Sequence, residues 1–153
     1  MRVKLFVPIL VLTLLVAIAP VVAMRPSPRQ AQLARLRARA TALGMRVQVD
    51  AAGTRAGHAD YVLPWRLDEA REVRLRSFAL ERTAGAGWHA GTMDRGVQEL
   101  ARGLPHDLPA GAFALRSGAD GLLVRWDEKG CEADVERIGM ALRGLREALG
   151  TQG

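Results

Sequence analysis

Hydrophobic and polar residues follow different periods in successive parts of the chain, and each period predicts an element. The first segment, residues 5–24, is apolar and contains no charged residue. At about 1.5 Å per residue, a helix of this length spans roughly 30 Å, the thickness of the hydrocarbon core of a bilayer. Residues 1–24 are therefore predicted to form a single transmembrane anchor.

A short amphipathic helix is predicted to follow. Ser27 can cap it, Pro28 suits its first position, and Gly44 is typical of a C-terminal stop. The next apolar residues recur every three or four positions and so share one helical face: Leu33, Leu36, Ala40 and Leu43. Residues 25–44 are therefore predicted to be a basic juxtamembrane neck helix.

From Met45 onward the period of two indicates strands. The segments that fit strands are 45–49, 59–65, 73–80, 88–92, 112–116 and 121–126, with a phase slip near Ser77 that predicts a bulge. Helices are predicted from Asp94 to about Arg102 and from Glu132 to Gly150. Because the connections are of hairpin length, residues 45–150 are predicted to form an α+β domain, a mainly antiparallel sheet with two to three amphipathic helices.

The positive charge of the chain is concentrated before this domain. The net charge is +6, but residues 1–43 hold seven of the 22 basic residues and no acid, so the rest of the chain is near neutral. A nucleic-acid-binding domain carries its basic excess on the folded part, so nucleic acid is not an expected partner. Five neck arginines are candidates for lipid-headgroup contact, or serve only as a topology signal on a solvated face: Arg25, Arg29, Arg35, Arg37 and Arg39.

The same charges favour one topology. The more basic flank of an apolar helix stays in the cytoplasm, which predicts a single-pass protein of the bacterial inner membrane with its domain in the cytoplasm. The alternative is a signal peptide that is cleaved after Ala23, since Val21 and Ala23 fit a small-residue cleavage site. The domain would then be exported to the periplasm.

No catalytic, cofactor or metal motif is present, so no cofactor is expected. The histidines and Cys131 have no ligand spacing, and a lone cysteine excludes an internal disulfide. The acidic residues from Asp127 to Asp134 lack a calcium-loop pattern and favour a solvated helix start. Three tryptophans on predicted strands serve core packing or, if exposed together, a partner surface: Trp65, Trp88 and Trp126.

Two segments carry a resemblance. Met24-Arg-Pro-Ser-Pro-Arg-Gln after an apolar helix, together with Trp126-Asp-Glu-x-Gly and the last helix, is similar to a group of uncharacterised small single-pass bacterial inner-membrane proteins. Such proteins are sometimes labelled YajC-like accessories of the preprotein translocase, a likeness that covers only residues 1–30. The resemblance implies a membrane location and no activity.

These features lead to one functional hypothesis and two alternatives. The chain is expected to be a membrane-anchored accessory or interaction protein without catalysis, whose partners are the lipid bilayer and another membrane or envelope protein. One alternative is the exported domain. The other is an enzyme whose site is assembled from scattered residues such as His89, His106 and Asp107.

Overall fold

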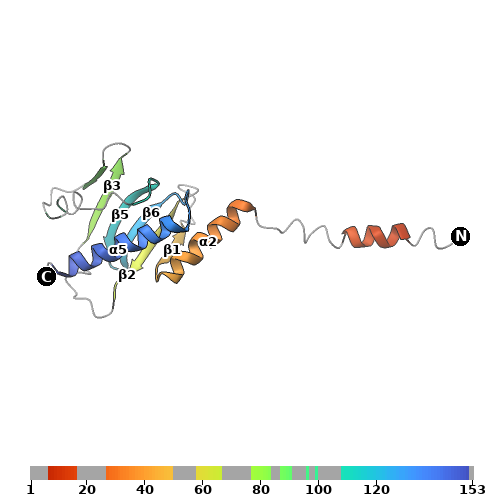
Figure 1. Ribbon diagram of the computed structural model, residues 1–153, viewed down its shortest axis with the longest axis horizontal. Coiled ribbons are helices and arrows are strands. Elements are labelled where there is room, and N and C mark those ends of the chain that lie inside the picture. The colour runs from red at the N-terminus through yellow and green to blue at the C-terminus, as the bar shows by residue number, and fades with distance from the viewer. Residues whose placement is uncertain are drawn as a thin grey trace. The chain divides into compact units, whose positions relative to one another are not determined.

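A six-stranded antiparallel sheet forms the centre of the fold, as the computed structural model shows (Figure 1). The structure describes residues 7–16, 27–49, 58–66, 77–83, 87–90, 96, 99 and 108–151. The strand order is β1-β2-β6-β5-β3-β4. The strands are β1 (Arg46–Val49), β2 (Ala59–Pro64), β3 (Phe78–Thr83), β4 (Gly87–Ala90), β5 (Ala112–Gly118) and β6 (Gly121–Trp126).

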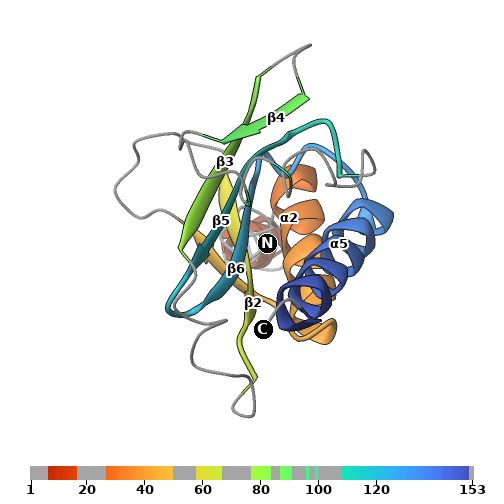
Figure 2. The same ribbon diagram turned by 90° about the vertical axis from the view of Figure 1, so that its left-hand side faces the viewer.

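Two helices, α2 (Pro28–Ala42) and α5 (Glu132–Thr151), lie on the same face of this sheet (Figure 2). A reciprocal pair of hydrogen bonds starts α2: the Ser27 amide donates to Gln30 Oε1 at 2.9 Å, and the Gln30 amide donates to Ser27 Oγ at 3.2 Å. Gly44, with φ of 80°, follows the end of the helix in the left-handed conformation. The predicted cap, first position and stop of this helix are confirmed.

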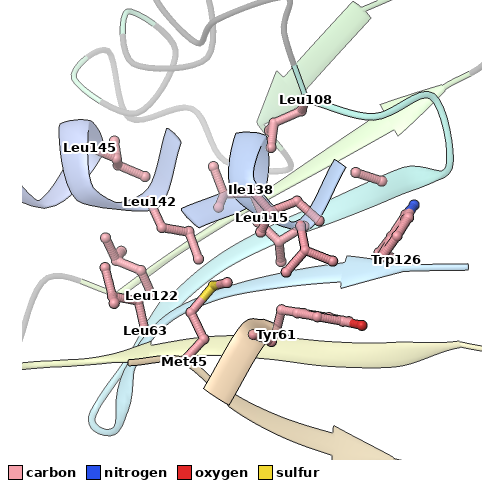
Figure 3. Close-up of a cluster of buried hydrophobic side chains, with 14 of the residues drawn as sticks. Met45, Tyr61, Leu63, Leu108, Leu115, Leu122, Trp126, Ile138, Leu142 and Leu145 are labelled. Carbon is pink, nitrogen blue, oxygen red and sulfur yellow. The ribbon is translucent and has the colours of Figure 1, made fainter. Parts of the chain in front are cut away.

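The hydrophobic core fills the space between the sheet and the two helices (Figure 3). One row of inward residues crosses all six strands, and its members are Val47, Tyr61, Val124, Leu115, Leu80 and Ala90. Leu36 of α2 and Ile138 of α5 are buried against this layer. Burying one such large apolar side chain stabilises the fold by about 1.5–3 kcal/mol. The part of α2 from Leu33 onward belongs to the same compact unit as the sheet, Leu33–Gly153.

The predicted α+β class and antiparallel sheet are confirmed. The hairpin of β5 and β6 closes at Gly121, whose φ of 149° and 2.1 Å approach of its Cβ position to Leu63 O require glycine. The final helix begins at Glu132 as predicted, but it continues through Gly150 to Thr151. Of the helix predicted at 94–102, Gly96 and Glu99 are helical, and the other positions lie outside the described residues, as do 67–76.

The register irregularity of the sheet lies between Ala112 and Ala114 of β5. The bulge predicted near Ser77 falls next to residues outside the described part, and β3 begins one residue later, at Phe78.

The predicted transmembrane anchor is wrong. In the other compact unit, Met1–Gln32, the apolar segment is described as a helix over residues 7–16, and 17–26 lie outside the described residues. No helix in the described part of the chain is long and apolar enough to cross a membrane. The single-pass, inner-membrane location depended on that anchor and loses its support.

Candidate functional site

A buried carboxylate lies where the sheet leads into α5. This is the carboxylate of Glu128, which follows β6 and is 1% exposed. Arg37 of α2 donates two hydrogen bonds to it, from Nε to Oε1 at 2.9 Å and from Nη2 to Oε2 at 2.8 Å. The Tyr61 hydroxyl of β2 donates a third, to Oε1 at 3.1 Å. One side chain thus joins three elements that are far apart in sequence, and we call Arg37, Tyr61 and Glu128 the carboxylate cluster.

The backbone around Glu128 is arranged for this role. Glu128 has φ of 53°, and a non-glycine residue in that left-handed region costs about 1–2 kcal/mol. Charge-assisted hydrogen bonds, which are roughly twice as strong as neutral ones, offset the strain. Gly130 allows the tight turn into α5, because a Cβ there would lie 2.4 Å from Asp134 Oδ2 and 2.8 Å from Trp126 Cζ2.

The electrostatics of the cluster favour a structural role. Burial, together with the neighbouring charge and hydrogen bond of Glu128, raises the pKa of Tyr61 well above its ordinary value near 10. The hydrogen bonds to Glu128 raise the pKa of Arg37. A carboxylate that is 1% exposed and accepts three hydrogen bonds is enclosed by its own partners. The cluster therefore holds α2 against the sheet.

A second ion pair joins the two helices. Arg39 of α2 binds Glu136 of α5, and both side chains are about two-fifths exposed. Two of the five arginines predicted to contact lipid headgroups, Arg37 and Arg39, are therefore engaged within the folded unit. Arg35 is exposed, Arg29 lies in the first turn of α2, and Arg25 lies outside the described residues. Lipid contact by these arginines stays a prediction.

Neither α2 nor α5 lies on the opposite face of the sheet, as Figure 2 shows, and we call that face the helix-free face. The cross-strand register places one row of residues across all six strands of this face: Gln48, Asp60, Arg125, Ala114, Glu81 and His89. Five of its six members are polar, the exception being the buried Ala114, and we call this the polar row. Asp60 and Arg125 form two hydrogen bonds of 2.6 Å within it. Along each strand these residues alternate with those that face the core, so their side chains lie on the other face of the sheet. That face therefore presents ordered charges.

Apolar residues interrupt the charges of this face. The adjacent row contains Val62, which is buried, and Leu123, which is half-buried, beside the exposed Arg116. Arg116 reaches back to Glu81 of the polar row at 3.9 Å. At one end of the face, the rings of His58 and Phe113 meet edge to face, with centroids 4.9 Å apart. The face therefore combines fixed ion pairs with apolar and aromatic groups.

The other sequence candidates are dispersed. Cys131 is exposed and caps α5: its amide donates to Asp134 Oδ2 at 2.9 Å. His89 is exposed on β4 near Thr83, while residues 106 and 107 lie outside the described part, so the scattered enzyme site stays a prediction. Among the described residues, no group of three or more His, Cys, Asp or Glu side chains could hold a metal ion.

The three tryptophans serve packing. Trp126 is buried and lies edge-on to Tyr61, with ring centroids 5.6 Å apart. Trp88 lies under Arg82 at 5.8 Å, and Trp65 donates from Nε1 to the Gly118 carbonyl at 2.8 Å. Within the described part of the chain, the indole nitrogens of Trp88 and Trp126 are buried without a hydrogen-bond partner. The alternative of an exposed tryptophan surface has no support from Trp126.

Sequence reasoning missed the residues that matter most here. Glu128 stands among other acids, which predicts a solvated helix start, and only its left-handed backbone turns it inward. Tyr61 was predicted to share a strand face with Ala59 and Leu63, and all three are buried. The pairing of Asp60 with Arg125 depends on the β2–β6 register, which strand periodicity does not specify.

No family model, curated protein or solved structure matches this chain. The resemblance to small single-pass membrane proteins stays a prediction.

The carboxylate cluster predicts an unusual titration of Tyr61, the only tyrosine of the chain. Because its pKa is raised in the folded state, the native phenol should keep its proton above about pH 10, where the unfolded phenol loses it. The protonated phenol of Tyr61 makes its full contribution to the free energy of unfolding below about pH 10. As the pH rises further, this contribution is lost by up to about 1.4 kcal/mol per pH unit. Ultraviolet absorbance of the phenolate measures both states.

The native protein should show no phenolate signal at a pH where the same protein in denaturant is half ionised. A Tyr61→Phe variant should lose the alkaline decline in unfolding free energy. Equal titration midpoints in the native and denatured protein would show that the hydroxyl is not buried against Glu128.

Proposed function

We propose that the folded unit is a protein-binding module without catalysis of its own, and that it binds its partner with the helix-free face of the sheet. The observation that carries this proposal is the polar row, which extends across all six strands on the face that α2 and α5 leave uncovered. The proposal keeps the predicted interaction role and drops the membrane anchor.

The composition of the face supports binding to a protein. Interfaces are enriched in arginine and aromatic residues around a partly apolar centre. Here Arg116 and Arg125 flank the half-buried Leu123, and Phe113 lies nearby on β5. Arg125 is held by two hydrogen bonds to Asp60 before any partner arrives. A side chain that is already ordered loses less conformational entropy on binding, which favours affinity.

The ion pairs also argue against catalysis by Glu128 and Asp60. General acid–base catalysis needs a carboxyl group that can reach a substrate proton. Glu128 is enclosed by Arg37 and Tyr61, and Asp60 is paired with Arg125. Both carboxylates therefore have structural partners in place of a substrate.

Site-specific photo-crosslinking in the native cell tests the binding face. A photoreactive residue in place of Arg116, whose side chain is 48% exposed on the helix-free face, should form an adduct with a discrete protein. The matched control replaces Arg137, whose side chain is 54% exposed on α5 at the opposite face, and should give no such adduct. Adducts of equal intensity at both positions, or none at Arg116, would contradict the proposal.

A second candidate function, export of the module, is supported by the N-terminal helix. Eight of its apolar side chains are half or more exposed: Val7, Ile9, Leu10, Val11, Leu12, Leu14, Leu15 and Val16. These residues would lie in the apolar region of a signal peptide. Arg2 and Lys4 supply the basic start, and Val21 to Ala23 supply the cleavage site. We infer that cleavage after Ala23 releases the module to bind an envelope protein.

Intact mass spectrometry of the mature protein from the native cell tests export. The expected mass is that of a chain beginning at Met24, whereas the complete chain has a mass of 16.6 kDa. As a control, an Ala23→Leu variant, with a large residue at the cleavage position, should keep the N-terminal segment. Recovery of the complete mass from the unmodified protein would refute cleavage and leave the binding proposal standing.

A further inference from the structure

β1 is an edge strand of the described sheet. It pairs with β2 on one side, and no described strand pairs with it on the other. In an antiparallel ladder, such an edge directs backbone N–H and C=O groups outward, where they form a template for pairing. Proteins protect free edges with charged side chains, above all lysine, with proline, with a bulge or by keeping the strand very short. The four-residue strand Arg46-Val-Gln-Val49 has one charge, at its first position, but it contains no lysine or proline, and its register with β2 is continuous.

The side chains of β1 are suited to pairing with an apolar strand. Val47 and Val49 occupy the alternate positions of β1 that lie on the core face of the sheet, and Val47 packs against the core. Val49 is 51% exposed, although valine favours the interior of sheets. Arg46 and Gln48 occupy the other positions, which lie on the helix-free face. Any strand that pairs here must place an apolar residue opposite Val49.

We propose that a second copy of this chain pairs with β1, antiparallel and about a twofold axis through Gln48. Directly opposite residues of an antiparallel pair lie on the same face of the sheet. The twofold axis must therefore pass midway between the two copies of one residue, which then lie opposite each other. An axis at Arg46 would place two like charges opposite each other. An axis at Val47 leaves Val49 without a partner inside the strand, and an axis at Val49 pairs Val49 with itself but leaves every other residue of the strand without one. With the axis at Gln48, Val47 of each copy lies opposite Val49 of the other.

This register also joins the binding faces of the two copies. Gln48 is the first member of the polar row, so Gln48 beside Gln48 of the second copy continues one row into the other. Two glutamine amides can donate and accept hydrogen bonds across the axis without opposing charges. The dimer would present a twelve-stranded sheet, with α2 and α5 of both copies on one face and the two polar rows joined end to end on the other. The dimer does not depend on the identity of the module's partner.

Disulfide trapping in the full chain tests this register. Cys131→Ser removes the only native thiol, and Gln48→Cys then places two thiols across the axis. Opposite Cβ atoms in a sheet lie about 4.5–5.5 Å apart, close to the separation that a disulfide needs. Under mild oxidation the variant should form at least about tenfold more covalent dimer than the control, because pairing raises the effective thiol concentration.

The matched control is Arg116→Cys in the same background, on the interior strand β5 with an exposed side chain. Association through the apolar N-terminal helix would crosslink neither position selectively. Adding Val49→Lys to the Gln48→Cys chain should abolish the excess of covalent dimer, since it brings a charge opposite Val47. Equal crosslinking of Gln48→Cys and Arg116→Cys, or an excess that survives Val49→Lys, would overturn the proposal, and so would occupation of β1 by another protein.

Discussion

The ion pair between Arg37 and the buried carboxylate of Glu128 connects the parts of this fold that the sheet itself does not connect. It attaches α2 to the end of β6, and the Tyr61 hydroxyl extends the contact to β2. The pair is directional, so it orients α2 where apolar contacts alone would permit sliding. Breaking a buried pair leaves an uncompensated charge, which is far more costly than losing a surface pair. The cluster therefore determines where the N-terminal helix of the folded unit lies.

The position of α2 divides the molecule into two functional halves. With α2 and α5 on one face, the core row of the sheet is covered and the polar row remains on the other face (Figure 2). An antiparallel sheet tolerates this arrangement because its residues alternate between faces. The covered face supplies stability, and the other face carries the ordered charges of the polar row. The proposed binding site depends on this one-sided packing, and the proposed dimer would extend the same face.

Local patterns predicted much of this fold, and long-range pairing limited the rest. Ser27 and Pro28 predicted the start of α2, and the alternation around Tyr61 predicted its buried strand. Hydropathy failed at the N-terminus because it measures only how apolar residues 5–24 are, whereas no helix in the described part of the chain is long and apolar enough to cross a membrane. It failed at Glu128 because charge predicts exposure, whereas a left-handed backbone and a guanidinium from 91 residues away make burial favourable. A hydrogen bond between residues so far apart in the chain cannot be predicted from the sequence around Glu128 alone.

Equilibrium unfolding of Glu128→Gln beside Glu136→Gln tests the central claim most directly. Both variants remove one charge from an arginine pair of α2, but Glu128 is buried and Glu136 is exposed. The free energy of unfolding should fall by about 2–4 kcal/mol in Glu128→Gln, and by less than about 1 kcal/mol in Glu136→Gln. Amide hydrogen exchange should accelerate in α2 of the first variant only. Equal losses, with α2 equally protected in both variants, would contradict the role given to the carboxylate cluster.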